Sequence, residues 1–203
     1  MEGLTIRKAL ADDTEHIAAI IHGEAGQEAT AIAGCEEAAI AFGMAMVRMK
    51  NGPQGWQHSI VADLDGGVAG VLQSNAGGDF TITSSLALLA VRILGVSVIT
   101  ALPRLRARRR VDIPHPDGAY HVAELHTHPA LRNRGIGGAL LDHAEREARW
   151  AGMRLMSLNT TTINPARHLY ERHGFRVVET RTDPAYERIT GIAGRHLMVK
   201  ELT

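Results

Sequence analysis

The stretch Arg132-Asn133-Arg134-Gly135-Ile136-Gly137-Gly138 separates two segments of different periodicity. Residues 120–127 before it are strand-like, and apolar residues after it recur at helical spacing until Gly152. A glycine turn between a strand and a helix presents free backbone N–H groups, and the helix dipole there favours anions. Glycine also lets the backbone approach a phosphate without a Cβ in the way, and the two arginines add charge. The stretch therefore predicts a phosphate-binding turn.

Two other nucleotide-binding motifs do not fit this turn. A P-loop needs Gly-Lys-Ser/Thr, which the stretch lacks. A Rossmann fingerprint needs a third glycine where Leu140 stands, and an acidic residue about 20 positions further on, near Leu155 and Met156. Neither a P-loop nor a Rossmann site is therefore expected.

The rest of the chain alternates short strand-like and helical segments. Strands are predicted at residues 4–8, 58–63, 68–73, 120–127, 155–158, 175–179 and 196–202. Helices are predicted after a cap at Asp12, Asp13 or Thr14, and over residues 35–50, 136–152 and 164–174. The segment Leu64-Asp65-Gly66-Gly67 predicts an antiparallel hairpin turn. With no internal repeat and no low-complexity linker, we expect one mixed α/β domain spanning residues 1–203.

Residues 74–118 depart from this pattern and predict a helical insertion within the domain. Residues 86–102 are strongly apolar, and five arginines lie between residues 104 and 110. A run of 17 residues interrupted by Arg92 falls short of the ~20 apolar residues that a membrane span needs, so no span is expected. We expect a buried or dimer-facing helix from Ser84 or Ser85 to Pro103, with the arginines at a solvated or anion-facing end. A membrane anchor is the alternative.

Composition limits the partners of the chain. Its 22 basic and 22 acidic residues cancel, so no net field draws the whole molecule onto nucleic acid or a membrane, and any bound anion must be held locally. The single cysteine, Cys35, excludes an intramolecular disulfide, fits a reducing compartment and is interpreted as core packing. The N-terminus carries no secretion signal, so a cytoplasmic protein is expected.

Two ordered segments resemble the motifs of the GNAT superfamily of acetyl-CoA-dependent N-acetyltransferases. HPALRNRGIG at residues 128–137 resembles motif A, Arg/Gln-x-x-Gly-x-Gly/Ala after a strand that ends in x-Pro. NPARHLYERHGF at residues 164–175 resembles motif B, with the gap from Asn to Ala one residue shorter. The resemblance is clear over residues 120–180 and does not cover residues 74–118. It implies a GNAT-like mixed, mostly antiparallel central sheet flanked by helices.

The resemblance also implies roles for individual residues. The backbone of Leu125 and Thr127 would pair with the pantetheine arm of acetyl-CoA, although Thr127 stands where the family usually has Val. Residues 132–138 would hold the pyrophosphate, and Asn164 would contact the cofactor arm. Tyr170 matches the position whose phenol protonates the departing CoA thiolate, with a core aromatic as the alternative. The expected cofactor-binding residues are Leu125, Thr127, Arg132, Asn133, Arg134, Gly135, Ile136, Gly137, Gly138 and Asn164.

A second polar cluster consists of His121, Glu124, His126 and His128, of which His126 and His128 are interpreted as surface or core histidines. Glu124, His126 and His128 span too much of one straight strand to converge on one ion, so no metal is expected. His121 matches a histidine of the family's aralkylamine acetyltransferases, and Glu124 resembles the acidic residue of its polyamine acetyltransferases. Residues 121 and 124 face opposite sides of a regular strand unless a bulge changes the parity. We expect His121 as general base and Glu124 as the carboxylate that orients the amine; a reversal of the two roles and a structural His121 are the alternatives.

Together these features predict an N-acetyltransferase. It would move an acetyl group from acetyl-CoA to a primary amine of a small molecule, by direct attack in a ternary complex. One alternative is a protein N-terminal or lysine acetyltransferase, with a groove open beside Tyr186 rather than covered by residues 84–110. A non-catalytic CoA-binding module is the other, and an intact Tyr170 argues against it. No motif names the acceptor, because acceptor choice in the family lies in the N-terminal helices, the insertion and residues 180–195.

Overall fold

A seven-stranded mixed sheet forms the centre of the molecule. The computed structural model of the chain describes residues 3–23, 26–49, 54–76, 84–94 and 97–202. The sheet order is β1-β2-β3-β4-β5-β7-β6, and all neighbours are antiparallel except β4 and β5. The strands are β1 (Leu4–Lys8), β2 (Ser59–Leu64), β3 (Gly67–Ala76), β4 (Ala119–Thr127), β5 (Leu155–Thr161), β6 (Arg176–Thr182) and β7 (Gly194–Glu201). The predicted mostly antiparallel sheet is confirmed.

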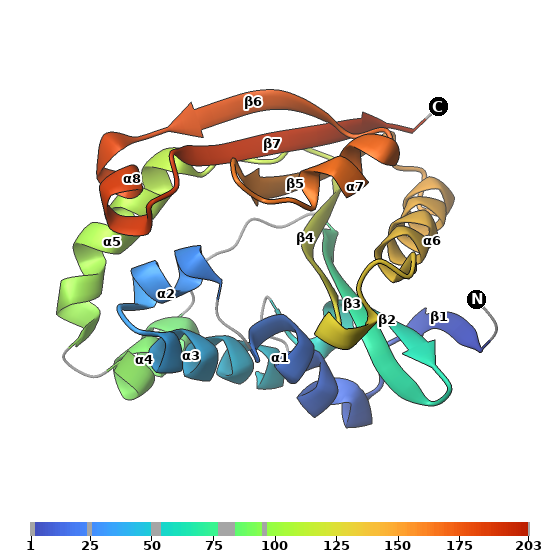
Figure 1. Cartoon of the computed structure of the whole chain (residues 1–203), viewed down its shortest axis with the longest axis horizontal. Helices are drawn as coiled ribbons and strands as arrows, with labels where there is room; N and C mark the ends of the chain where they lie inside the picture. The colour runs from blue at the N-terminus through green and yellow to red at the C-terminus, as the bar shows by residue number, and fades with distance from the viewer. Residues whose placement is uncertain (1–2, 24–25, 50–53, 77–83, 95–96, 203) are drawn as a thin grey trace.

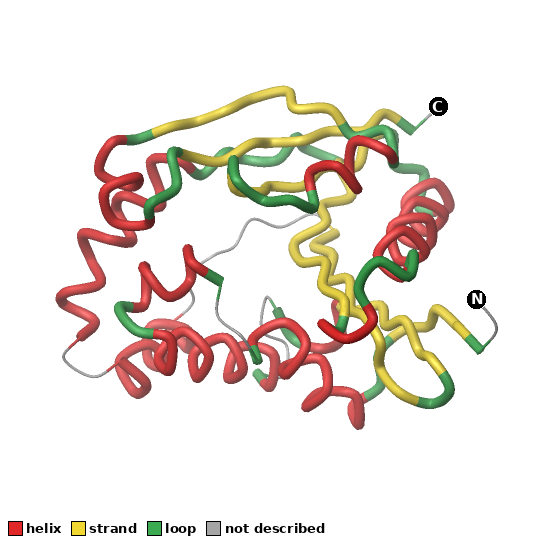
Figure 2. The backbone as a smooth tube through the Cα atoms, viewed as in Figure 1, coloured by secondary structure: helices red, strands yellow, loops and turns green. Residues whose placement is uncertain are grey.

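Helices cover both faces of this sheet (Figures 1 and 2). They are α1 (Thr14–His22), α2 (Gln27–Ala33), α3 (Glu36–Arg48), α4 (Ser84–Leu94), α5 (Ser97–Val111), α6 (Ile136–Trp150), α7 (Arg167–Arg172) and α8 (Pro184–Thr190). Three short 3₁₀ turns are η1 (Ala11–Asp13), η2 (Trp56–His58) and η3 (Pro129–Leu131). Of these helices, α6 packs on one face of the sheet, and α1 and α3 pack on the other.

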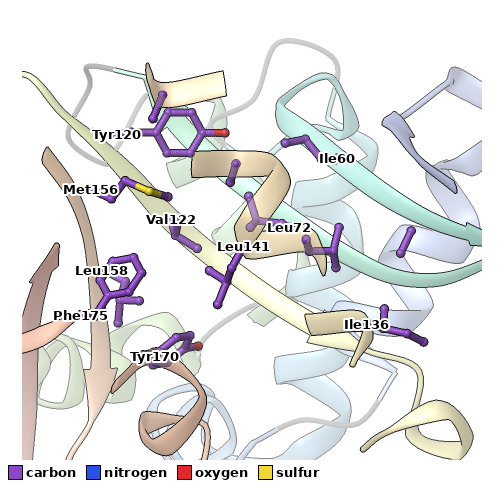
Figure 3. Packing of buried hydrophobic residues seen from close by; sticks show 14 of the residues in the cluster. Ile60, Leu72, Tyr120, Val122, Ile136, Leu141, Met156, Leu158, Tyr170 and Phe175 are labelled. Atoms are coloured by element: carbon purple, nitrogen blue, oxygen red, sulfur yellow. The ribbon is translucent and has the colours of Figure 1, made fainter. Parts of the chain in front are cut away.

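The main hydrophobic core lies between the sheet and α6 (Figure 3). Leu140, Leu141 and Ala144 recur on one side of α6, and each is at most 2% exposed. They pack with strand residues such as Leu72 and Val122. A smaller core on the opposite face joins α1 and α3 to β2 and β3. The helical periodicity of residues 136–152 thus predicted the buried face of α6 correctly.

The predicted hairpin turn between β2 and β3 is confirmed. Asp65 and Gly66 both have positive φ, 53° and 86°, as a tight two-residue turn requires. The side chain of Asp63 accepts a hydrogen bond from the Gly66 N–H at 2.8 Å, and Leu64 pairs with Gly67. Local turn chemistry is sufficient to set this part of the fold.

The helix predicted from Ser84 to Pro103 is wrong in its extent. Two helices, α4 and α5, occupy this segment, and residues 95 and 96 between them lie outside the described residues. Pro103 stands inside α5, which continues to Val111 and includes the arginines. An interior proline costs about 3 kcal/mol. Burial of Ala107 and Val111 against Tyr186 and Ile192 offsets that cost, and the sequence pattern gave no sign of this packing.

Three further expectations need correction. Two helices were not predicted. The first, α2, is capped at its C-terminus by Gly34 with φ of 101°, and the second, α8, lies within residues 180–195. Asp183-Pro184 at the start of α8 and Gly191 at its end are ordinary cap signals that would have found it. Cys35 is exposed at the N-cap of α3 instead of lying in the core.

No single helix among the described residues meets the length and hydropathy criteria for a membrane span. The bent pair of α2 and α3, which meet at 99°, does so on length and composition alone.

A charged cluster fixes the N-terminal strand to the sheet. Arg7 on β1 donates to Asp13 at 2.7 and 3.0 Å and to Asp63 on β2 at 2.9 and 3.1 Å. Asp13 was predicted as a helix cap, but its carboxylate accepts from Arg7 and from the Leu10 N–H and makes no side-chain cap bond to α1. The bond from Arg7 holds the pKa of Asp13 below its ordinary value, although desolvation opposes this shift.

We predict that Asp13→Asn lowers the free energy of unfolding by about 2 kcal/mol at pH 7, since charge-assisted hydrogen bonds are lost. A carboxyl group whose pKa is lowered by folding stabilises the fold above its unfolded pKa of about 3.9. The difference between wild type and variant should therefore shrink as pH falls from about 4 to 2. Urea unfolding across this range measures it. The exposed neighbour provides the control: an equal loss in Asp12→Asn would contradict the prediction.

Candidate active site

The site forms where β4 and β5 separate. Residues 119–122 of β4 pair with residues 155–158 of β5, after which β4 remains paired with β3 alone and β5 with β7 alone. A β-bulge starts this separation, because Gln73 pairs with Glu124 and Ser74 with Val122, so that Ala123 is an extra residue in β4. A cavity of about 1080 Å³ lies at the opening, lined by both strands, α7 and the N-terminus of α6.

The predicted phosphate-binding turn lines one end of this cavity. Asn133 and Gly135 adopt left-handed conformations, with φ of 63° and 80°, and Gly135 is the N-cap of α6. The first helical bond runs from the Ala139 N–H to the Gly135 carbonyl. The N–H groups of residues 136–138 precede that bond and can bind an anion. Of the residues predicted here, only Arg134 is not among those that line the cavity.

The glycines of this turn are required by close neighbours. A Cβ on Gly137 would lie 3.1 Å from Leu169 Cδ2 and 3.8 Å from Thr127 Oγ1. A Cβ on Gly138 would lie 3.1 Å from His173 Nε2. The start of α6 therefore lies directly against α7 and the end of β4. A larger residue at position 137 would push these elements apart and displace the N–H groups.

Tyr170 lies on α7 between the core and the cavity. Its side chain packs edge-to-face on Phe175, with ring centroids 6.2 Å apart, and lines the cavity (Figure 3). Desolvation, with a smaller contribution from the charge of Glu124, raises its pKa to about 12. The phenol is therefore protonated at neutral pH and is available as a proton donor.

The bulge at Ala123 determines which polar residues of β4 share a face. His121, Glu124 and His126 pair with residues 75, 73 and 71 of β3, which alternate along that strand, so all three lie on one side of the sheet. Glu124 and His126 line the cavity, and the Glu124 Oε2 atom is 2.9 Å from His126 Nε2. Desolvation acts to raise the pKa of Glu124, but the bond to His126 and nearby positive charge hold it below the ordinary value. A carboxylate–imidazole pair therefore faces the cavity.

His121 occupies a different environment from this pair. Its side chain is buried, its Nδ1 atom is 3.0 Å from Ser157 Oγ, and its ring stacks on His115 at a centroid distance of 4.6 Å. It is not among the described residues that line the cavity. The structure thus brings Glu124 to the cavity together with Tyr170, and leaves His121 in the packing behind it.

The remaining predicted residues occupy the walls between the two ends. Leu125 and Thr127 line the cavity on the part of β4 that is no longer paired with β5. Asn164 also lines it, but its amide donates to Thr160 Oγ1 at 2.8 Å and accepts from the Ala166 N–H at 2.9 Å. These bonds shape the turn before α7, which begins at Arg167, three residues later than predicted.

Residues from distant segments, which the sequence did not single out, line the opposite end. His22 on α1 reaches the cavity beside Gly43, where a Cβ would lie 2.3 Å from the imidazole ring. Its Nε2 atom is buried without a hydrogen-bond partner among the described residues. Burial lowers the pKa of His22, so the ring favours its neutral form. No local motif marks such a residue, because its position depends on the packing of α1 against α3.

An ionic cluster lies at this end of the cavity. Glu28 on α2 accepts from Arg195 on β7, from Arg108 Nε on α5 at 2.7 Å and from the Tyr186 hydroxyl on α8 at 2.6 Å. Tyr186 is fully buried, and Arg108 also pairs with Asp112. One carboxylate thus links four elements, and Glu28 and Arg195 line the cavity.

Comparison with known proteins identifies the family. Residues 55–177 match the model of the acetyltransferase (GNAT) domain, which is more than half of the chain. The chain therefore belongs to the GNAT acetyltransferase family and is an acyltransferase. A comparison with curated protein sequences gives no match.

Solved structures of acetyltransferases share the fold. The PaiA N-acetyltransferase of Thermoplasma acidophilum in complex with coenzyme A is similar at a TM-score of 0.60 and 15% identity, over 98% of this chain and 99% of that chain. A mosquito arylalkylamine N-acetyltransferase gives 0.60 and 17%, over 98% and 100%. An agmatine N-acetyltransferase gives 0.58 and 18%, over 99% and 100%.

Proposed function

We propose that the chain transfers an acetyl group from acetyl-CoA to a primary amine of a small molecule. The parting of β4 and β5 supports this, because an extended arm fits between two strands whose facing backbone groups lack a strand partner. The turn at residues 132–138 would hold the pyrophosphate on N–H groups that precede the first bond of α6. The fit depends on Gly137, where a Cβ would fill the space between Leu169 and Thr127.

The chemistry that we propose needs one proton donor and one proton acceptor. The amine nitrogen attacks the thioester carbonyl carbon, the carbon–sulfur bond breaks and the thiolate leaves. Tyr170 donates its phenolic proton to that sulfur, since its raised pKa keeps it protonated until charge develops. The attacking nitrogen releases a second proton as the amide forms, which balances the proton that Tyr170 gives up. No covalent intermediate with the protein is required.

The pair of Glu124 and His126 supplies the acceptor side in this proposal. An alkylamine is protonated at neutral pH and must lose a proton before it attacks. The low pKa of Glu124 favours a carboxylate that orients the ammonium group, and His126 beside it accepts the proton. We prefer His126 to His121 as general base, because His126 lines the cavity and His121 is buried against His115 and Ser157.

The cluster around Glu28 favours a small acceptor over a protein. A protein substrate needs an open groove beside Tyr186. Instead, α5 of the insertion packs against α2 and α8, and Arg108 and Tyr186 both bind Glu28 at the end of the cavity. This packing of α5 beside Tyr186 is the observation that supports a small-molecule amine.

We predict that Gly137→Val weakens the binding of acetyl-CoA by about 10- to 100-fold, the loss expected when bonds to a charged group are removed. Titration calorimetry measures the affinity, and circular dichroism checks that the fold is kept. Gly67→Ala is the matched control, because a Cβ at that position meets only the Leu64 carbonyl oxygen at 3.6 Å. A Gly137→Val protein with wild-type affinity would rule out the pyrophosphate assignment.

Replacement of Tyr170 by Phe tests the chemistry itself. We expect kcat to fall by about 10²- to 10⁴-fold with little change in acetyl-CoA affinity, because only the proton donor is removed. Release of free thiol is followed with a panel of primary amines and with peptides bearing free amino groups. Tyr120→Phe is the control: its pKa is also raised to about 12 by burial, but Tyr120 is not among the described residues that line the cavity. If Tyr170→Phe turns over as fast as wild type, Tyr170 has only a packing role. Faster turnover of peptides than of small amines would favour the protein acetyltransferase.

The pH dependence of kcat/KM tests the base. An imidazole that accepts a proton must be neutral, so the wild-type value should fall on the acidic side of the profile. His126→Ala should lose this acidic limb, whereas His121→Ala should keep it and Glu124→Gln should mainly raise KM for the amine. A limb that vanishes only in His121→Ala would assign the base to His121 acting through water.

A further inference from the structure

Positive charge is concentrated in the two helices of the insertion. Residues 84–111 contain six arginines and no acidic residue, although the whole chain has 22 basic and 22 acidic residues. The remainder of the chain therefore carries 16 basic against 22 acidic residues. The zero net charge of the molecule conceals a separation of charge, with a local excess of six positive charges in α4, α5 and the residues between them.

The two sides of α5 differ in character. Ala101, Ala107 and Val111 on the inner side are buried, and this side faces α2 and α8 at one end of the molecule (Figure 1). The opposite side is the outer face of α5. It consists of Leu102, Leu105, Arg106 and Arg109, whose spacing of three or four residues places them on one side of the helix. Both arginines are exposed, and the two leucines are 47% and 43% exposed.

The exposed side of α4 repeats this combination. Leu88 is 70% exposed and Val91 54%, and the exposed Arg92 follows at the next position on the same helical face. Half of the eight large hydrophobic side chains that are exposed in the described part of the chain thus lie on α4 and α5.

The outer arginines are not used by the fold. Arg108 pairs with Glu28 and Arg110 with Asp183, so these two serve to hold α5 in place. By contrast, Arg92, Arg106 and Arg109 form no ion pair with any residue that the structure describes. Their charge, together with the exposed leucines, is available to a partner.

We propose that the outer face of α5, together with the exposed residues of α4, binds the surface of an anionic lipid bilayer. Exposed leucines can reach the acyl boundary of a bilayer while the arginines beside them contact anionic headgroups. Nucleic acid would engage the arginines but gains nothing from exposed leucines. A second copy placed on the same face by two-fold symmetry would bring like charges together.

The test is sedimentation of the full chain with vesicles. We expect binding to mixed phosphatidylglycerol and phosphatidylcholine vesicles at low salt, and little binding to phosphatidylcholine alone. Each basic side chain near an anionic surface contributes roughly fivefold to partitioning, so Arg106→Gln/Arg109→Gln should reduce binding about 25-fold. Leu102→Ser/Leu105→Ser should also weaken binding and make the remainder more sensitive to salt, because only electrostatic attraction is left.

Matched substitutions elsewhere on the surface provide the control. Arg146→Gln/Val178→Ser removes an exposed arginine and an exposed apolar side chain from α6 and β6, and it should bind vesicles like wild type. Equal binding to both kinds of vesicle, no binding to either, or an equal loss in the control would overturn the proposal. Two further results would contradict it. One is that duplex DNA displaces the protein from vesicles and binds the Leu102→Ser/Leu105→Ser variant as well as wild type. The other is that light scattering shows a dimer that Leu102→Ser/Leu105→Ser converts to a monomer.

Discussion

An extra residue in one strand creates the space on which the proposed function depends. Ala123 bulges from β4, and beyond that point β4 and β5 are no longer paired. The opening exposes strand backbone to a cavity and directs the N-terminus of α6 toward it. The same bulge sets the side-chain parity, so that Glu124 and His126 share one face of β4 while Leu125 and Thr127 occupy the other. One local irregularity thus defines both ends of the site.

The two ends of the cavity are built in different ways. At the α6 end, the proposed anion site consists of backbone, and glycines at positions 135, 137 and 138 provide conformation and space. At the other end, side chains from four elements meet at Glu28, whose burial is tolerated because Arg108 and Arg195 compensate its charge. A site made of backbone suits a ligand that all members of a family share, because substitutions leave the backbone in place. A site made of side chains can be altered by substitution to suit a different acetyl acceptor.

The insertion contributes to both the interior and the surface. Its inner side joins α8 through Ala107 and Val111 and completes the ionic cluster through Arg108. Its outer face carries arginines and leucines that the fold does not use. Because a helix has two sides, one segment can join the ionic cluster at the cavity and still present a separate surface to a proposed partner.

The sequence alone determined the features that depend on local backbone chemistry. The hairpin at Asp65 and Gly66, the glycine turn before α6 and the buried face of α6 follow from φ preferences and helical spacing. Tertiary structure decided the rest. Strand pairing placed the bulge that puts Glu124 and His126 on one face of the sheet. Long-range packing buried His121 against His115, carried α5 through Pro103 and brought distant side chains to the cavity. These outcomes depend on contacts between residues far apart in the chain, which no local pattern encodes.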